Sequence, residues 1–412
     1  MQPVMAHRIA EWGRGRPAPP WELMVCPTHR CNLRCGICAR TWEGATAEPL
    51  RDELSEERWL HLVEEAAAMG VRYLNIGGGG EPTLRRELVL RMCAKAKASG
   101  MEVHLQTNGT TLTQDDLDGL IDLRLDYITV SVDGPTAEIN DAIRFKNAYA
   151  ETVKRIEWLN TLKKRRRSSI PHLQVNIVVT ALNYNVLDTM VDFCVGHGVE
   201  YLSAKTLLEY SPDMKAYILS AEQQSALPGE IENAIARARA VGLSNNLDSL
   251  LSASGATKCI GAFGTGTVVD KMPVSFAQVR CLEPWRGIVV SSSGHVAPCC
   301  FFWDGTADSI RDQSLHDVWH GPYLTSFRRQ LQRGELPEPC KTCGFPDSHE
   351  HRRLADCLAQ ALESKGKEYP SQVGLLGKAW NSLRRHGLRA SLRRYQEWRA
   401  IRRALYDESE KP

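Results

Sequence analysis

Three cysteines near the start of the chain have the clearest chemistry in the sequence. They lie in the segment Cys31-Asn-Leu-Arg-Cys35-Gly-Ile-Cys38. Soft thiolate ligands at this density select iron–sulfur clusters, zinc or copper(I). Structural zinc takes four ligands, and His29, which precedes Cys31 by two residues, has poor geometry for sharing one ion. The spacing therefore favours a cubane cluster with one open iron. A three-cysteine zinc knuckle that borrows a distant ligand is the alternative.

A second set of cysteines lies towards the C-terminus. Seventeen residues separate Cys281 from Cys299, with Gly294 between them, and Cys340-Lys-Thr-Cys343 follows after forty more. Two ligands from one segment and two from a later Cys-x-x-Cys pair make a closed four-thiolate site. Such a site suits an iron–sulfur cluster or a zinc ribbon, and the spacing alone leaves both open.

The elements that must position the first cysteines repeat regularly between residues 21 and 205. The expected strands are Trp21–Cys26, Val71–Ile76, Glu102–Gln106, Asp126–Ser131, His172–Val179 and Val199–Lys205. The expected helices are Leu54–Met69, Leu84–Ser99, one opened by the capping box Thr113–Asp116, Ala148–Lys164 and Val186–His197. Strict alternation predicts a parallel sheet of right-handed βαβ units. Six repeats are too few for a closed eight-fold barrel, so the sequence predicts an α/β fold with a partial, partly open (β/α)6 barrel.

The rest of the chain is less regular. Ser220–Val241 predicts a helix, Ile288–Val296 a hairpin turning at Ser293-Gly294, and Leu315–Leu331 a further helix. The predicted divisions are an irregular lead-in at 1–20, the barrel at 21–205, a connecting helical and Gly-rich segment at 206–280, a small α+β hairpin and helix domain at 281–348, and a basic helical tail at 349–412.

Composition limits the class of protein. Of the 412 residues, 43% are hydrophobic, which is ordinary for a globular protein. The formal net charge is +2, which gives no indication of a nucleic-acid partner. Thirteen cysteines, seven of them at ligand-like spacings, require a reducing compartment. The first twenty residues lack the apolar core of a signal peptide. We therefore expect a cytoplasmic protein without a transmembrane segment.

The cysteine triplet and the strand–helix repeats resemble the radical S-adenosylmethionine (radical SAM) superfamily, and the resemblance covers residues 20–205. It implies a (β/α)6 core and a 4Fe–4S cluster on Cys31, Cys35 and Cys38, whose open iron binds the amino and carboxylate groups of S-adenosylmethionine. Reductive cleavage of that cofactor would give a 5′-deoxyadenosyl radical that abstracts a hydrogen atom from the substrate. The resemblance also implies an electron donor such as flavodoxin or ferredoxin.

The expected carboxyl ends of the strands, where α/β barrels bind ligands, match cofactor positions of the family. Gly77-Gly-Gly-Gly80-Glu81 follows the second strand and resembles the family's GGE motif. In that motif Gly78, Gly79 and Gly80 would let the backbone approach the cofactor, and Glu81 would hold the methionyl ammonium group.

Further cofactor positions follow from the same resemblance. Thr107 and Asn108 follow the third expected strand, and Ser131 ends the fourth; all three would face the cofactor pocket. Ser131 and Arg144 would contact the cofactor carboxylate, although a surface salt bridge is an equal alternative for Arg144. Ile37 stands where the family usually has an aromatic residue near adenine, and we expect an aliphatic contact there.

Residues 281–344 resemble the SPASM/twitch auxiliary-cluster domain that follows many radical SAM cores. Four cysteines match the shorter twitch form, which implies one fully ligated auxiliary 4Fe–4S cluster on the second cysteine set. Such a cluster could accept the electron left on the substrate radical. Cys300, next to Cys299, is an alternative ligand.

The sequence favours a radical SAM enzyme that oxidises or rearranges a polar small molecule, such as a sugar or cyclitol. The alternative is a maturase that modifies a ribosomally made peptide, but only about twenty residues precede the barrel, which leaves no room for a leader-binding domain. A further alternative is a redox-neutral epimerase in which Cys259 donates a hydrogen atom. A passive iron–sulfur or zinc module is disfavoured because it needs no glycine–glutamate loop.

Overall fold

A parallel sheet with one antiparallel edge strand organises the part of the chain that the structure describes. The computed structural model describes residues 2–42, 52–145, 147–209, 211–251, 257–258, 276, 279–302, 308–341, 343 and 349–363. The strands of this sheet are β1 Glu22–Val25, β2 Tyr73–Ile76, β3 Glu102–Thr107, β4 Tyr127–Ser131, β5 His172–Val179, β6 Tyr201–Thr206, β8 Ser244–Asn245, β10 Gly287–Val290 and β11 Val296–Ala297. Their order is β11-β10-β1-β2-β3-β4-β5-β6-β8. The sheet has two open edges, which confirms a partial rather than a closed barrel.

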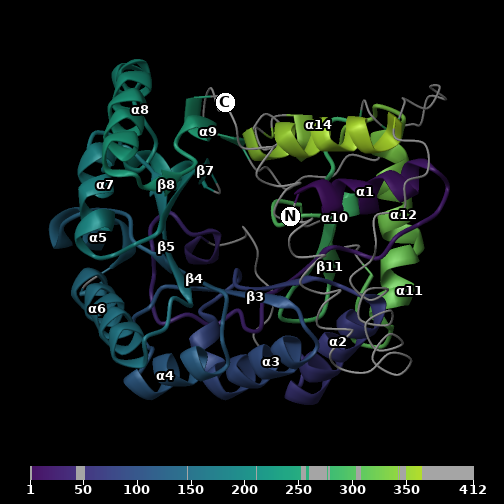
Figure 1. Ribbon diagram of the computed structural model, residues 1–412. Coiled ribbons are helices and arrows are strands. Elements are labelled where there is room, and N and C mark those ends of the chain that lie inside the picture. The colour runs from purple at the N-terminus through teal and green to yellow at the C-terminus, as the bar shows by residue number, and fades with distance from the viewer. Residues whose placement is uncertain are drawn as a thin grey trace, which may run out of the picture. The chain divides into compact units, whose positions relative to one another are not determined.

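The helices follow the strands as βαβ topology requires. They are α1 Gln2–Gly13, α2 Glu56–Met69, α3 Arg86–Ala98, α4 Gln114–Asp122, α5 Ala137–Arg144, α6 Ala148–Arg166, α7 Leu187–Gly196, α8 Ala221–Val241, α9 Asp248–Leu251, α10 Glu283–Arg286, α11 Leu315–His320, α12 Pro322–Gln332, α13 Glu338–Lys341 and α14 His349–Glu363. Short 3-10 turns occur at η1 Ala39–Thr41, η3 Pro82–Arg85 and η4 Pro212–Ala216, and β7 Leu208–Glu209 pairs separately with β9 Thr257–Lys258. In Figure 1, α3, α4 and α6 lie along one side of the strands.

Local sequence signals set the helix ends in the barrel. The Ser55 side chain accepts a hydrogen bond from the backbone N–H of Arg58 and begins α2, and Gly70 ends that helix with φ +82°. The predicted capping box of Thr113 and Asp116 is present at the start of α4. These caps confirm the predicted positions of both helices.

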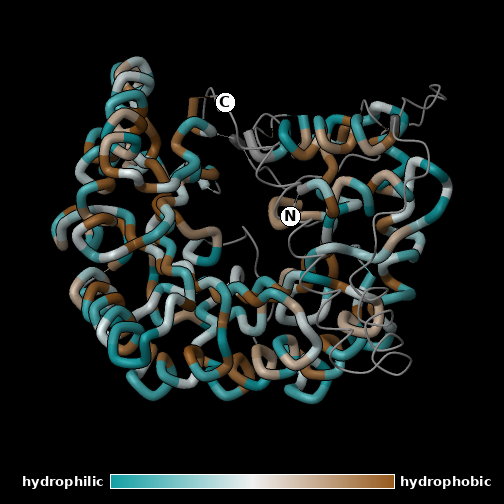
Figure 2. The backbone as a smooth tube through the Cα atoms, in the orientation of Figure 1, coloured by the Kyte–Doolittle hydropathy of each residue, from teal (hydrophilic) through white to brown (hydrophobic). Residues whose placement is uncertain are grey.

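The sheet has an apolar face and a polar face. Side chains on one face are buried against the helices, among them Leu23, Val25, Leu74, Ile76, Leu105, Ile128, Val130, Leu173, Val175, Ile177 and Leu202. Figure 2 shows brown and teal residues alternating along the chain, as expected when each element buries one side. Residues at the intervening strand positions are mostly polar, so the second face can meet a polar ligand.

The start of the chain differs from the prediction. The irregular lead-in expected at 1–20 is wrong for residues 2–13, which form α1. Met5, Ala6, Ile9 and Ala10 recur at helical spacing and are buried. Abundant Arg, Pro and Gly between residues 8 and 20 obscured this stripe, because their composition is typical of loops.

The predicted hairpin is confirmed, and it extends the barrel sheet. Strands β10 and β11 pair antiparallel around Gly294, whose φ is +94°. On its other side β10 pairs in parallel with β1, with Gly287 opposite Glu22. The single helix predicted at Leu315–Leu331 is instead two helices, because Gly321 and Pro322 separate α11 from α12.

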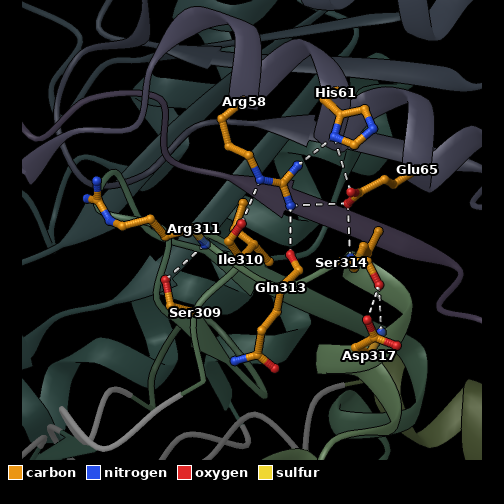
Figure 3. A network of polar contacts seen from close by, with 10 residues as sticks. Arg58, His61, Glu65, Ser309, Ile310, Arg311, Gln313, Ser314 and Asp317 are labelled. Carbon is orange, nitrogen blue, oxygen red and sulfur yellow. Dashed lines mark hydrogen bonds and ion pairs between the residues drawn. The ribbon is translucent and has the colours of Figure 1, made fainter.

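A polar network joins α2 to the segment after the hairpin (Figure 3). Arg58 Nε donates to the carbonyl of Ile310 at 2.6 Å, and Arg58 Nη2 donates to the carbonyl of Gln313 at 2.9 Å. Glu65 Oε2 accepts from Arg58 Nη2 at 3.2 Å and from the backbone N–H of Leu315 at 3.0 Å. The barrel and the segment that follows the hairpin are therefore fixed to one another by more than the sheet.

The contacts divide the chain into Met1–Glu363 and Ser364–Pro412. Within the predicted tail, α14 is helical, and residues 364–412 lie outside the described residues. In the described residues, none of the helices combines the length and apolar character that crossing a membrane requires.

Candidate functional site

The loop with the first three cysteines lies directly against the glycine run. The backbone N–H of Gly80 donates to the carbonyl of Thr28 and that of Glu81 to the carbonyl of Arg30, both at 2.8 Å. A Cβ at Gly80 would lie 2.0 Å from the Arg30 carbonyl oxygen. Glycine is therefore required at this position because two backbone segments meet there. The sequence predicted a close backbone approach, and here the approach is to the cysteine loop.

Glu81 is buried and its carboxylate joins the ends of two strands. The residue is 2% exposed. Its Oε1 accepts from the backbone N–H of Thr83 at 3.0 Å, from the Thr83 hydroxyl at 2.5 Å and from the Thr107 hydroxyl at 2.6 Å. Its Oε2 accepts from the backbone N–H of Asn108 at 2.7 Å. An ionised carboxylate offers about four acceptor positions, so protein donors already occupy most of this one.

Asn108 continues the connection to the cysteine loop. Its Nδ2 donates to Asn32 Oδ1 at 2.9 Å and lies 3.9 Å from Cys31 Sγ. Asn32 Nδ2 donates in turn to the hydroxyl of Thr110 at 2.7 Å. Thr107 and Asn108 were predicted to face a cofactor. In the structure, the Thr107 side chain binds Glu81 and the Asn108 side chain binds the cysteine loop, so both hold these groups in place.

Arg144 ends α5 beside the second cysteine of the loop. Its carbonyl accepts from the Cys35 thiol at 3.5 Å, and its Nε lies 2.7 Å from Asp133 Oδ2. Burial is the largest single influence on Arg144 and opposes its charge, but Asp133 together with negative charge on Cys35 and Cys38 outweighs burial and raises the pKa of the guanidinium. Neither Nη atom has a hydrogen-bond partner among the described residues. A charged guanidinium with free donors at this place is suited to a ligand carboxylate.

The three thiols lie within electrostatic reach of one another. Burial raises the pKa of Cys35 to about 11 and also raises that of Cys31, and a negative charge on Cys38 contributes to both shifts. Ligand thiolates must lose their protons when they bind a metal. The donor set, three half-buried cysteines on one short loop, fits an iron–sulfur cluster. Ile37 is also half-buried, and Ser131 ends β4 as predicted.

Tyr217 also contacts the cysteine loop, and the sequence analysis missed it. The backbone N–H of Gly36 donates to the carbonyl of Ile143 at 2.9 Å. A Cβ at Gly36 would lie 1.9 Å from the Tyr217 hydroxyl oxygen. Glycine between the second and third cysteines is therefore a packing requirement. A glycine inside the motif was the only signal, and it does not say which residue lies against it.

The second cysteine set comes together from two segments. Arg280 Nη1 and Nη2 donate to the carbonyls of Lys341 and Cys343 at 3.4 and 3.3 Å. Burial raises the pKa of Cys281 strongly, and negative charge on Cys343 and Cys340 adds to the shift. The two halves of the set are therefore close in space.

Cys299 and its neighbour Cys300 differ in burial. Cys281, Cys299 and Cys340 are half-buried and pack against a second hydrophobic core that includes residues of α1, α10, α12 and α14, whereas Cys300 is exposed. This difference favours Cys299 over Cys300 as a member of the set. Cys259, the predicted hydrogen donor, lies outside the described residues. In the described ranges, no three His, Cys, Asp or Glu side chains are grouped closely enough to hold a single metal ion.

The polar face of the sheet carries a hydrogen-bonded chain that the sequence analysis did not predict. Gln106 Nε2 donates to Asn75 Oδ1 at 2.7 Å, and Asn75 Nδ2 donates to Glu22 Oε1 at 3.0 Å. Arg286 donates from Nη2 to Glu22 Oε2 at 2.6 Å and from Nη1 to Glu283 Oε1 at 2.9 Å. This series of hydrogen bonds runs from β3 across β2 and β1 to α10, next to Cys281.

A second series of hydrogen bonds on the same face determines which ring nitrogen of His104 carries the proton. The hydroxyl of Thr129 donates to Gln174 Oε1 at 3.2 Å and must therefore accept from His104 Nε2, 2.7 Å away. His104 Nδ1 then accepts from the Tyr73 hydroxyl at 2.8 Å. Burial lowers the pKa of His104 to about 4, so the ring is neutral at pH 7. Alternation of polar and apolar residues in the strands was the signal that could have revealed this face.

Comparison with known proteins agrees with the fold and the two cysteine sets. Residues 25–209 match the radical SAM superfamily, and residues 281–344 match SPASM, an iron–sulfur cluster-binding domain. A PqqA peptide cyclase of Rhizobium meliloti is 26% identical over 376 residues, which cover 87% of this chain and 88% of that protein.

Two solved structures share the fold. Streptococcus suis SuiB bound to S-adenosylmethionine has a TM-score of 0.60 and 17% identity, covering 82% of this chain and 75% of SuiB. SuiB bound to its precursor peptide SuiA has a TM-score of 0.57 and 18% identity, covering 79% of this chain and 71% of SuiB. The predicted radical SAM core and auxiliary domain are thus confirmed. The chain belongs to the radical SAM superfamily, and it is an enzyme with a C-terminal SPASM domain that uses S-adenosylmethionine and two 4Fe–4S clusters.

Proposed function

We propose that this enzyme modifies a ribosomally made peptide by radical chemistry. The observation that supports this most directly is the similarity to a PqqA peptide cyclase, which extends over 87% of the chain. The shared fold with SuiB, a protein solved with its precursor peptide, agrees with it. The sequence alone favoured a polar metabolite as substrate. The comparisons favour the peptide, which was the alternative.

The first cysteine set would hold the cofactor cluster. Cys31, Cys35 and Cys38 would be its protein ligands, and the guanidinium of Arg144 would bind the cofactor carboxylate, with Ser131 beside it on β4. Bound together, the reduced cluster and S-adenosylmethionine supply a 5′-deoxyadenosyl radical. Gly78 and Gly79, with φ of +81° and +63°, would offer their backbone to the cofactor ammonium group.

Glu81 would serve the cofactor mainly by position. Its carboxylate accepts hydrogen bonds from Thr83, Thr107 and Asn108, and Asn108 reaches Cys31 and Asn32. The buried charge therefore fixes the cysteine loop relative to the ends of β2 and β3. Ile37 would provide the aliphatic contact expected near adenine.

The second cysteine set would hold the auxiliary cluster. Cys281, Cys299, Cys340 and Cys343 would leave no open coordination position, so the substrate would not bind to this iron directly. We assign the auxiliary site as the acceptor of the electron that remains after hydrogen abstraction and oxidation of the peptide. A reduced flavodoxin or ferredoxin would be the external donor for the first cluster.

The polar face of the sheet would receive the peptide. Gln106, Asn75 and Glu22 present amide and carboxylate groups along this face, and the Arg286 guanidinium balances the Glu22 charge. Paired polar groups of this kind can bind amide groups and polar side chains of a peptide without leaving a charge unpaired. The neutral ring of His104, fixed by Tyr73 and Thr129, adds no charge to the face.

The test uses the full chain, reconstituted anaerobically with iron and sulfide and supplied with S-adenosylmethionine and a reductant. Candidate precursor peptides are compared with a panel of sugars and cyclitols. We expect peptide to stimulate 5′-deoxyadenosine formation and to lose two hydrogen atoms by mass spectrometry. The Cys35→Ala variant should form no 5′-deoxyadenosine. Stimulation by a polar metabolite, with every peptide inert, would overturn the proposal.

A further inference from the structure

A second hydrophobic core lies beside three of the four auxiliary cysteines. Its buried members come from α1, α10, α12 and α14 and from residues near them: Met5, Ala6, Ile9, Ala10, Val279, Leu282, Trp285, Phe302, Phe327, Leu331, Leu354 and Leu358. Cys281, Cys299 and Cys340 are among the half-buried residues packed against it. Three of the four auxiliary cysteines therefore lie beside an apolar core from which water is nearly excluded.

Two of the helices in this core lie outside both family matches. The matched segments are 25–209 and 281–344, whereas α1 is Gln2–Gly13 and α14 is His349–Glu363. In Figure 1 the two helices run next to one another. Arg14 Nη2 donates to the carbonyl of Ala361 at 2.5 Å, and a Cβ at Gly13 would lie 3.1 Å from Leu362 Cδ2. Helices α1 and α14, from the two ends of the described chain, thus pack together in the second hydrophobic core, and we call this helix pair the cover.

His351 connects this cover to the auxiliary cysteines. The residue is 4% exposed, and its Nε2 accepts a hydrogen bond from the backbone N–H of Leu282 at 3.0 Å. Leu282 directly follows Cys281 in the sequence. Because Nε2 accepts, the neutral ring carries its proton on Nδ1. A histidine from α14 therefore fixes the backbone at the first residue after a cysteine of the set.

This hydrogen bond has a consequence for an iron–sulfur cluster. Hydrogen bonds to the sulfurs and access of water are two properties that set cluster reduction potentials. Reduction adds negative charge, which donors and water stabilise. A backbone N–H next to a ligand cysteine is a candidate donor to cluster sulfur, and here His351 Nε2 accepts it instead. The apolar side chains of Leu354 and Leu358 exclude water from the same side.

We infer that α14 is part of the auxiliary site, and that His351 is a positioning residue which holds the Leu282 N–H away from the cluster and keeps its reduction potential low. The inference rests on the proposed assignment of Cys281 as a cluster ligand. It does not depend on the substrate, so the test needs no peptide. Failure of the peptide proposal and failure of this inference are therefore distinguishable.

The test is an EPR-monitored redox titration of the reconstituted full chain. His351→Leu keeps the site apolar but removes the acceptor. At a fixed ambient potential we expect at least a tenfold shift towards the reduced auxiliary cluster, about 59 mV for one electron. The signal and potential of the first cluster should not change. His351→Gln, whose amide oxygen can accept the same N–H, should restore most of the parent value.

A matched control separates the hydrogen bond from the cover. Leu358→Ala leaves His351 in place and opens a cavity in the same core, so it should speed iron loss in air with a smaller shift in potential. Thermal unfolding of each variant shows whether the chain still folds. An unchanged potential in a folded His351→Leu variant would overturn the inference. Equal shifts in His351→Leu and Leu358→Ala, or a parent protein with only one cluster, would also overturn it.

Discussion

Replacing Glu81 with glutamine tests whether this residue acts through position or by direct contact with the cofactor. Glu81 is 2% exposed, and its carboxylate accepts four hydrogen bonds from three residues. Glu81→Gln keeps the shape of the side chain but replaces one oxygen with an NH2 group. Whichever oxygen is lost, a donor on Thr83, Thr107 or Asn108 then faces another donor.

The size of the effect follows from these contacts. A hydrogen bond to a charged group contributes about 1.5–3 kcal/mol, and a buried donor left without an acceptor costs about 1–3 kcal/mol. If the NH2 group replaces Oε2, the Asn108 backbone N–H loses its only Glu81 acceptor, and the bonds to Oε1 weaken with the loss of charge. We expect the free energy of unfolding to fall by about 2–4 kcal/mol.

The assay is urea unfolding of the cluster-free chain, followed by calorimetric titration of S-adenosylmethionine into the reconstituted protein. Glu87→Gln is the matched control, because Glu87 is an exposed acid in the first turn of α3. It should change stability by no more than about 0.5 kcal/mol. If Glu81→Gln left stability unchanged and weakened cofactor binding, the carboxylate would contact the ammonium group directly, and the positioning argument would be refuted.

Three further predictions follow from the same structure. The free energy of unfolding should fall as pH drops from about 6.5 to about 4, because in this window His104 binds a proton in the unfolded chain but not in the buried ring. His104→Gln should lower the slope of unfolding free energy against pH by up to about 1.4 kcal/mol per pH unit, and an unchanged slope would contradict this prediction. In urea unfolding, Arg58→Ala should lower the free energy of unfolding by about 1–3 kcal/mol, because it loses hydrogen bonds to two backbone carbonyls. The control Arg91→Ala, which breaks an exposed ion pair, should lower it by less than about 1 kcal/mol. Equal effects of the two variants would show that the Arg58 network is not stabilising. Replacing Cys340 and Cys343 with Ala should remove about four of eight irons and leave cofactor cleavage intact, and zinc at these positions in the parent protein would refute the cluster assignment.

The barrel could be predicted because its signals are local. Each strand is a short apolar or alternating run, and Ser55, Gly70 and Thr113 mark helix ends through contacts within a few residues. The cysteine triplet is equally local. Such features depend on neighbours in the sequence, so one chain is enough to recognise them.

The structure adds what depends on distant partners. Helix α1 is apolar on one side only, and the helix that packs against that side, α14, is more than three hundred residues away in the sequence. The sequence predicted Glu81 as the partner of the cofactor ammonium group, but it does not show that Thr83, Thr107 and Asn108 converge on the carboxylate. Tyr217 against Gly36 is a further case. In each, the residue type was visible in the sequence but the contact was not.

The pairing of β10 with β1 explains how one chain arranges two cysteine sets at opposite ends of its polar face. Both strands run in the same direction, with Gly287 beside Glu22 at their amino ends. Cys281 lies six residues before Gly287, and Cys31 lies six residues after Val25, the last residue of β1. The auxiliary set thus approaches the amino ends of the strands, and the cofactor set follows the carboxyl ends.

The strand between these ends spans about 13 Å, from four residues at about 3.3 Å each. The hydrogen-bonded chain from Gln106 through Glu22 to Arg286 and Glu283 covers the same interval on the polar face. If a peptide binds on this face, as proposed, it would lie between the proposed cofactor site and the proposed auxiliary cluster. Because β1 and β10 are paired in one sheet, a rigid element fixes the separation of the two sites.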